Sequence, residues 1–329
     1  MPLRRSTRFE SPTRATNSLS SKVRDSEAFR SKTGAMRILV GSDLSEASDV
    51  AVRQGAALLR AEGDELALCH VLPEPQLRTL FPQEHERDLA ALLELQPRFA
   101  EALRAQVVRL LGSNAVPFNV FIEQGSDYSE LIRRAEQWRA DLVVVGSHGR
   151  AGLGRFFSPS VAERVVRHAT CPVLVARERE PGVVLVATDL SDPSLKAIEA
   201  GAREAIVRER RLVVMHAAEG LSWRTEPAMA LLGANPVTET PDIVQERATL
   251  ARQIIEGALD RFGAKGEVQV VTGDPATKIL ELVETLPAEL LVVGTRGRSG
   301  LSRIMLGSVA AHLVQSAPCS VLAVRLAAA

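Results

Sequence analysis

Leu290–Ala311 reads LLVVGTRGRSGLSRIMLGSVAA, and this stretch decides how the chain folds. A short apolar run ends at Gly294, Gly297 follows, and nine further residues lead to Gly307 and Ser308 at the start of a helical pattern. A strand, a glycine turn and a helix start in this order gather backbone N–H groups around an anion, and glycine lets the backbone approach that anion closely. We therefore expect a phosphate-binding loop in which Ser308 caps the helix and donates its hydroxyl to the same oxygens.

The chain contains a second copy of this stretch. Asp141–Ala162 reads DLVVVGSHGRAGLGRFFSPSVA, and its Gly146 precedes Gly294 by 148 residues. Asp43 precedes Asp189 by 146 residues, each in a D-L-S sequence after an apolar run. Spacing that holds over so many positions indicates an internal duplication, with a two-residue insertion between the early and late parts of the repeat.

Short apolar runs alternate with helical patterns in both copies. The predicted strands of the first copy are Arg37–Gly41, Glu65–Val71, Phe118–Ile122, Asp141–Val145 and Val173–Ala176, and those of the second include Val183–Ala187, Leu212–His216, Leu290–Val293 and Val321–Val324. This alternation predicts two tandem Rossmann-like α/β domains, at residues 36–178 and 182–325, each a doubly wound, five-stranded parallel sheet. We expect a connection over Pro73–Pro97, because of its prolines, and then a helix at about Arg98–Leu111. In such sheets ligands bind beyond the carboxyl ends of the strands.

Composition and charge exclude several classes of protein. Residues 1–35 hold eight basic and three acidic residues without apolar periodicity, which predicts a disordered basic tail. We interpret this tail as inert, or as sequence before a true start at Met36; binding to nucleic acid, anionic lipid or a kinase is the alternative. The remaining chain is mildly acidic, which argues against a nucleic-acid surface. No apolar run approaches the roughly 18 residues of a membrane helix. The three cysteines lack metal-like or disulfide-like spacing, so we expect a cytoplasmic protein.

The G-x2-G-x9-G-S spacing, the early aspartates and the duplication together resemble the universal stress protein family in its tandem form. In nucleotide-binding members this glycine pattern holds the phosphates, and the end of the second strand flanks the adenine. The resemblance implies ATP bound at the edge where the strands end, Mg²⁺ or Mn²⁺ as a companion of the phosphates, pairing of the domains about a pseudo-twofold axis, and a stress-response regulatory role. The predicted nucleotide-binding residues are Thr188, Asp189, His216, Val293, Gly294, Arg296, Gly297, Arg298, Gly307, Ser308 and Val309 in the second domain, and Ser42, Asp43, His70, Gly146, His148, Gly149 and Ser160 in the first.

The first copy departs from the pattern at one position. Gly146, Gly149 and Ser160 are in place, but Pro159 stands where the second copy has Gly307. Proline has no N–H, so a pocket that uses a donor there loses one hydrogen bond, worth roughly 0.5–1.5 kcal/mol. We therefore expect the first domain to bind nucleotide more weakly than the second.

No catalytic residue and no metal site are predicted. Phosphoryl transfer needs a positioned nucleophile or water and charge neutralisation by lysine or a metal, and neither glycine loop contains a lysine or an obvious general base. A nucleotide-binding regulatory protein is therefore the first hypothesis. A slow ATPase or autokinase and a nucleotide-free interaction protein remain as alternatives. A homodimer is compatible with the sequence, which does not indicate a downstream protein partner.

Overall fold

The computed structural model describes residues 35–60, 62–73, 82–112, 117–147, 161–218, 240–295 and 306–325. Ten strands in these residues join one sheet in the order β3-β2-β1-β4-β5-β10-β9-β6-β7-β8. The strands are β1 Arg37–Gly41, β2 Glu65–Pro73, β3 Phe118–Gly125, β4 Leu142–Gly146, β5 Val173–Ala176, β6 Val183–Ala187, β7 Leu212–Ala218, β8 Glu267–Thr272, β9 Ala288–Gly294 and β10 Ser320–Val324. The helices are α2 Glu46–Ala57, α3 Pro82–Leu111, α4 Asp127–Trp138, α5 Val161–His168, α6 Asp192–Arg208, α8 Pro241–Arg261, α9 Pro275–Thr285 and α10 Ser308–Ser316.

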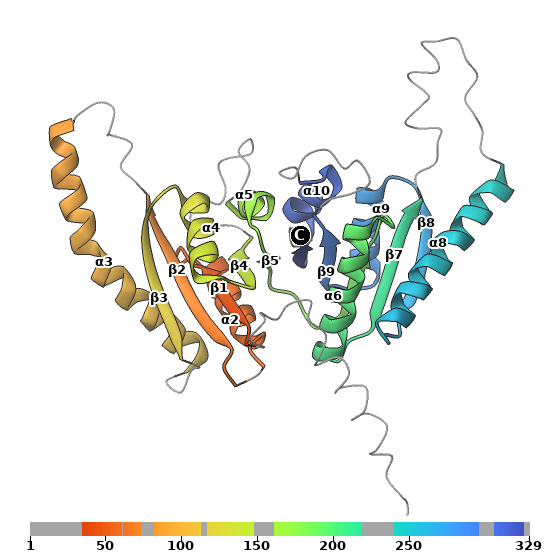
Figure 1. The fold of residues 1–329 in the computed structure, drawn as a ribbon, viewed down its shortest axis with the longest axis horizontal. Coiled ribbons are helices and arrows are strands. Elements are labelled where there is room, and N and C mark those ends of the chain that lie inside the picture. Colours follow the sequence, from red (N-terminus) through yellow and green to blue (C-terminus); the bar gives the residue numbers. More distant parts are fainter. Residues whose placement is uncertain are drawn as a thin grey trace, which may run out of the picture.

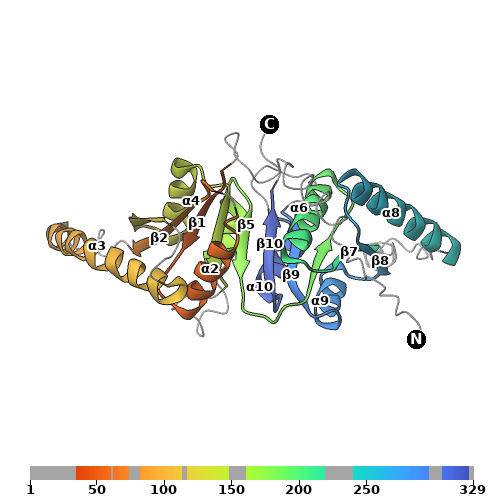
Figure 2. The same ribbon diagram turned by 90° about the horizontal axis from the view of Figure 1, so that it is seen from below.

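Each half of the sheet is a parallel unit with the same strand order. β1 pairs with β2 and β4, and β6 pairs with β7 and β9 in the same way. The halves meet where β5 and β10 run antiparallel, with Leu174 opposite Leu322. Figures 1 and 2 show the two halves side by side as near-symmetric units, with α3 and α8 at the outer ends. The predicted fold class, two tandem Rossmann-like domains, is confirmed.

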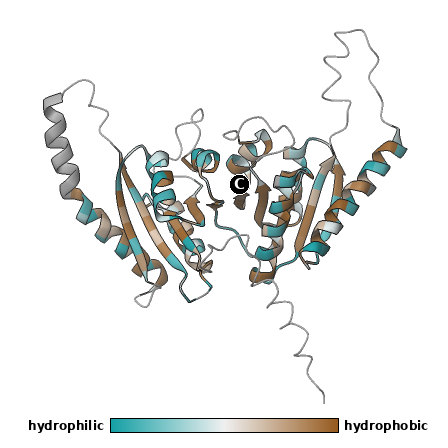
Figure 3. Cartoon of the chain, in the orientation of Figure 1, coloured by the Kyte–Doolittle hydropathy of each residue, from teal (hydrophilic) through white to brown (hydrophobic). Residues whose placement is uncertain are grey.

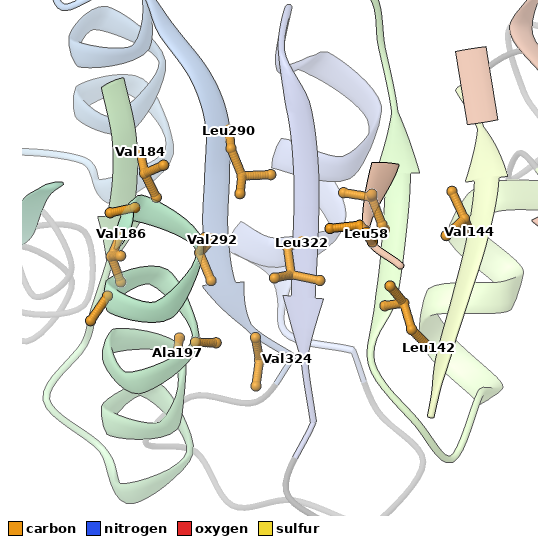
Figure 4. Packing of buried hydrophobic residues seen from close by; sticks show 14 of the residues in the cluster. Leu58, Leu142, Val144, Val184, Val186, Ala197, Leu290, Val292, Leu322 and Val324 are labelled. Carbon is orange, nitrogen blue, oxygen red and sulfur yellow. The ribbon is translucent and has the colours of Figure 1, made fainter. Parts of the chain in front are cut away.

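Helices cover both faces of the sheet. On one face α2, α3, α6 and α8 pack against alternate strand residues such as Val184, Val292 and Leu322, which Figure 4 shows across neighbouring strands. On the other face α4, α5, α9 and α10 pack against the intervening residues, such as Leu185 and Leu291. Strands that are buried on both faces must be apolar almost throughout, and Figure 3 shows the central strands in brown.

Gly201 allows α6 to pack closely on β6. A Cβ atom at Gly201 would lie 2.1 Å from Cγ2 of Val186, a distance that no real contact tolerates. The Gly201→Ala substitution is therefore expected to lower the free energy of unfolding by about 1–2 kcal/mol, because overpacking exceeds the gain in helix propensity. Urea denaturation measures this change. Gly257→Ala in α8 is the matched control: its Cβ would meet nothing within 4 Å, so the same substitution there is expected to stabilise. Stabilisation by both substitutions would contradict the packing argument.

Two arginines connect the halves across the β5–β10 junction. Arg177, directly after β5, donates from its guanidinium to the carbonyl oxygens of Val314 and Cys319 in the second half. Arg325, directly after β10, donates to the carbonyl oxygen of Arg167 in the first half at 2.8 Å. The contacts with Val314 in α10 and with Arg167 in α5 place a cation at the last turn of a helix, where carbonyl groups lack intrahelical partners and positive charge is favourable. The reciprocity agrees with the pseudo-twofold axis that the resemblance implied.

The prediction for Pro73–Pro97 was wrong. Instead of a connection throughout, β2 extends to Pro73, and α3 begins at Pro82 and continues through Pro97 to Leu111. Pro97 removes one backbone donor, but the residues before it, ERDLAALLELQ, are mostly strong helix formers. A single proline therefore does not end this helix.

The cysteines behave as small apolar residues. Cys69 and Cys319 are buried, Cys171 is half-buried, and all three are free thiols. Burial raises the pKa of the Cys69 thiol to about 12 and that of the Cys319 thiol to about 11. The thiolate, which is the reactive form, is therefore suppressed at neutral pH.

Candidate functional site

The turn after β6 fixes a carboxylate at the edge of the second half. The backbone N–H of Thr188 donates to the Met215 carbonyl oxygen at 3.0 Å. Oδ1 of Asp189 accepts from the backbone N–H and the hydroxyl of Ser191, at 3.1 and 2.5 Å. Leu190 between them has φ 65°, a left-handed conformation that costs a non-glycine residue roughly 1–2 kcal/mol. Strain of this kind persists where the surroundings hold it, and it concentrates at functional sites.

His216 stabilises the same turn from the neighbouring strand β7. Its Nδ1 lies 2.8 Å from the carbonyl oxygen of Thr188, and because a carbonyl only accepts, Nδ1 carries the hydrogen. The imidazole is buried and has a fixed orientation at the end of β7.

The first half repeats these contacts. Nδ1 of His70 lies 2.7 Å from the carbonyl oxygen of Ser42. Ser45 donates to Oδ1 of Asp43 from its backbone N–H at 3.1 Å and from its hydroxyl at 2.5 Å. Leu44 has φ 62°. The duplication visible in the sequence therefore extends to the strained turn.

The glycine stretch of the second half ends at a helix N-terminus, but not with the predicted cap. Gly307 is the N-cap residue and Ser308 is the first helical residue, so the prediction that Ser308 caps the helix was wrong. The N–H of Gly307 donates to the Thr295 carbonyl oxygen at 3.0 Å, which closes the loop rather than serving a ligand. The amides of residues 308–310 form the first turn, where no intrahelical carbonyl reaches them. These amides are the ones suited to an anion.

This use of the Gly307 amide also corrects the expected effect of Pro159. We expected proline to remove a donor to the ligand, whereas the equivalent donor in the second half closes the loop. Pro159 itself lies outside the described residues, as do six predicted site residues, Arg296, Gly297, Arg298, His148, Gly149 and Ser160.

The structure brings the other predicted residues of the second half together around one cavity of about 730 Å³. They are Thr188, Asp189, His216, Val293, Gly294, Gly307, Ser308 and Val309. A volume of this size is typical of sites for cofactors and small molecules. Because β9, β6 and β7 are neighbours in that order, the cavity extends from the start of α10, past Asp189, to His216.

Sequence reasoning missed one wall of this cavity. Helix α8 contributes Arg247, Leu250, Ala251 and Ile254. Leu250 is 57% exposed and Ile254 is 38% exposed, so α8 presents apolar side chains to an open space. The sequence does place Leu250 and Ile254 four residues apart, in addition to the core positions of the helix. No motif indicates that such a pair lines a cavity.

In the described part of the first half, side chains of α3 lie beside the ends of β1 and β2, the strands equivalent to β6 and β7. Phe99 of α3 stacks on His70, with ring centroids 4.7 Å apart. The Ser42 hydroxyl donates to Oε1 of Gln106 at 2.8 Å, and Gln106 is buried. The predicted residues Ser42 and His70 are therefore already engaged by α3.

Packing alone requires a glycine at position 146. A Cβ atom there would lie 2.6 Å from the backbone oxygen of Ala47 in the first turn of α2. The residue must be glycine for α2 to pack at the end of β4, whether or not a ligand binds nearby.

Among the described residues, no group of three or more His, Cys, Asp or Glu side chains is placed to hold a metal ion. In the same part of the chain, none of the helices has the length and apolar character required to span a bilayer.

Comparisons with known proteins agree with this architecture. The model of the universal stress protein family matches twice, at residues 35–177 and 182–325. The universal stress protein Rv2005c of Mycobacterium tuberculosis is 28% identical over 309 residues, which cover 88% of this chain and 96% of that protein. A universal stress protein of Mycolicibacterium smegmatis is 29% identical over 303 residues, with the same coverage of 88% and 96%.

The fold is also similar to that of a solved structure. The crystal structure of a universal stress protein from Archaeoglobus fulgidus aligns with a TM-score of 0.59 at 20% identity, covering 88% of this chain and 98% of that one. With two family matches that together span most of the sequence, this chain belongs to the universal stress protein family, in its tandem form.

Proposed function

We propose that this protein binds an adenine nucleotide, ATP foremost, in the cavity of the second half, and that occupancy regulates its action in a stress response. The observation that carries this proposal is the order of chemical groups along the cavity. First-turn amides lie at one end, a carboxylate in the middle, and an imidazole with apolar side chains at the other end. A nucleotide has phosphates, a sugar and a base in the same order.

Helix α10 supports the assignment of the phosphates to its end of the cavity. The amides of residues 308–310 and the positive end of the helix dipole favour an anion at this position. The hydroxyl of Ser308 lies at the same helix start and supplies a further donor. Among the described residues that line the cavity, Arg247 is the one Lys or Arg, and it lies on α8 rather than at the glycine stretch.

A divalent cation would be held mainly by the phosphates. Asp189 is the one carboxylate among the described residues lining the cavity, so the protein offers few of the oxygen ligands that Mg²⁺ or Mn²⁺ requires. ATP titrations with and without EDTA test this part of the proposal. Loss of affinity on chelation is expected, because the metal neutralises charge on the ligand.

Calorimetric titration of the full chain with ATP tests the proposed function. We expect one tight site per chain, and no binding at millimolar ATP would overturn the proposal. Phosphate release measured on the same samples separates a binding protein from a slow ATPase. Steady phosphate release that depends on Asp189 would indicate an ATPase instead of a protein regulated by nucleotide binding.

The Asp189→Asn substitution is expected to weaken ATP binding about 10-fold or more, because a charged acceptor for the ribose hydroxyls becomes a neutral one. Asparagine retains an oxygen that accepts from Ser191, so the strained turn should persist. Asp43→Asn in the first half is the matched control and should leave the tight site unchanged. Titration of both variants measures the difference, and an equal effect from the two would contradict the assignment of the site to the second half.

A further inference from the structure

Two buried hydroxyl groups at the end of β6 lie side by side on the wall of the cavity. Oγ1 of Thr188 is 2.8 Å from Oγ of Ser194, which belongs to the first turn of α6, and both residues line the cavity. Thr188 is 6% exposed and Ser194 is 3% exposed, so neither hydroxyl lies at the open surface. A buried polar group in such a place finds its hydrogen-bond partners on the protein or in the cavity.

The hydrogen bonds around this pair leave one acceptor position on Ser194. Its hydroxyl donates to the carbonyl oxygen of Ser191 at 2.8 Å, so the hydrogen between the two hydroxyls comes from Thr188. Oγ1 of Thr188 also accepts from the backbone N–H of Leu190 at 3.0 Å. A hydroxyl oxygen can accept two hydrogen bonds, and among the described residues Oγ of Ser194 accepts from Thr188 alone.

The first half shows what such a hydroxyl pair can bind. Ser42 and Ser48 are the equivalent residues by the repeat spacing, and Gln106 of α3 contacts both. Nε2 of Gln106 donates to Oγ of Ser48 at 3.2 Å, and Oε1 accepts from Oγ of Ser42 at 2.8 Å. Nε2 also donates to Oδ1 of Asp49 at 2.7 Å, which fixes the orientation of the amide, because a carboxylate only accepts. The pair therefore binds a planar group in which a donor lies beside an acceptor.

The separation of the two hydroxyls differs between the halves. The oxygens are 3.2 Å apart in the first half and 2.8 Å apart in the second. The shorter distance is typical of an O–H···O hydrogen bond, whereas the longer one exceeds the normal range. The hydrogen of Ser42 is therefore used mainly by Gln106. Thr188 can turn its hydrogen toward an acceptor in the same way.

Helix α8 provides no counterpart of Gln106 among its described residues that line the cavity. Leu250, Ala251 and Ile254 have no polar side-chain atom, and the guanidinium of Arg247 donates but cannot accept. A group that both donates and accepts, as the Gln106 amide does, is therefore left for a ligand to supply.

We propose that Thr188 and Ser194 recognise the edge of the nucleotide base and select adenine over the 6-oxopurines guanine and hypoxanthine. Ser194 accepts from the 6-amino group, and Thr188 donates to the ring nitrogen beside it. That the ligand is a nucleotide rests on the proposed function above. The 6-oxygen of an oxopurine only accepts, and the Ser191 carbonyl holds the hydrogen of Ser194, so two acceptors would face each other.

Calorimetric titration of the wild-type full chain with different bases tests this selection without any substitution. Inosine triphosphate (ITP) has an oxygen in place of the 6-amino group, and we expect it to bind about 10- to 100-fold more weakly than ATP. Purine riboside triphosphate has only hydrogen at this position. It should be intermediate, because it loses one hydrogen bond without placing an acceptor against Ser194. Equal affinity for ATP and ITP would overturn the inference and leave the proposed nucleotide site in place.

The Ser194→Ala substitution removes the acceptor for the 6-amino group. We expect ATP affinity to fall about 5- to 10-fold and ITP affinity to stay the same or rise, so the preference for ATP narrows. Ser48→Ala is the matched control, since Ser48 donates to the Ser45 carbonyl at 2.7 Å as Ser194 does to that of Ser191. It removes the same contact from the turn of the first half and should leave both affinities at the tight site unchanged.

The outcomes separate this inference from the proposed function. If Ser194→Ala weakens ATP and ITP binding equally, the residue acts through the turn and the inference is overturned. If the substitution changes neither affinity, the base is recognised elsewhere, which also overturns it. If the wild-type protein binds neither ATP nor ITP, the proposed function itself fails. Nucleotide binding without selection therefore contradicts the inference alone.

Discussion

Gly307→Asp is expected to lower the affinity for ATP by about 100-fold or more while leaving the protein as stable as the wild type, or slightly more stable. An N-cap side chain folds back over the amides of the first helical turn, and aspartate is among the best caps. At position 307 its carboxylate would occupy the amides that we assign to the phosphates, and its charge would repel them. Calorimetric titration with ATP and urea denaturation of the same variant measure the two effects.

The Gly307→Asn substitution separates two effects of the aspartate: covering the first-turn amides and repelling the phosphates by its charge. Asparagine has nearly the same size and also caps the helix, but it is neutral, so an intermediate loss of affinity is expected. ATP binding that survives Gly307→Asp would show that the first turn of α10 does not hold the phosphates. A variant that loses binding together with stability would instead point to a damaged loop between Thr295 and Gly307.

The junction of the two halves is expected to depend strongly on Arg177. Its guanidinium is largely withdrawn from water, and this burial lowers its pKa. Its hydrogen bonds to the carbonyl oxygens of Val314 and Cys319 compensate for that cost. Arg177→Ala leaves both carbonyls without this donor, so we expect the free energy of unfolding to fall by about 2–4 kcal/mol. Urea denaturation followed by far-ultraviolet circular dichroism measures the loss.

Two further variants serve as comparisons for the loss of stability in Arg177→Ala. Arg177→Lys keeps the charge but not the planar group that reaches two carbonyls, so an intermediate loss is expected. Arg53→Ala removes an exposed arginine whose contact with Glu178 spans 3.4 Å, and it should change stability by less than about 0.5 kcal/mol. A loss from Arg177→Ala no larger than that from Arg53→Ala would mean that strand pairing alone holds the junction.

Much of the fold could be predicted because it depends on local patterns that occur twice. The apolar runs gave the strands, and the repeated aspartates and glycines gave the duplication and the edge where ligands bind. The glycine spacing brought Gly294, Gly307 and Ser308 to one cavity, although it did not reveal that the Gly307 amide closes the loop onto Thr295.

The helix walls of the two sites could not be predicted in this way. Contacts such as Phe99 with His70 join residues far apart in the sequence, and no local spacing encodes them. Pro97 also led us to expect a connection where α3 continues. The connections before α3 and α8 differ in length. The constant spacing between the two copies therefore does not show which residue of α8 is equivalent to a given residue of α3.

The antiparallel contact of β5 with β10 has a consequence for how such a protein can diverge. Two separate copies of one domain, joined edge to edge, must carry identical sites, because every substitution appears in both. Here both copies belong to a single chain, and each can accumulate changes by itself. One copy has Phe99 against its histidine and Gln106 against Ser42, and the other has Arg247 and Ile254 lining a cavity. Covalent fusion thus permits an asymmetric pair, in which the two members differ in the side chains at their equivalent strand ends.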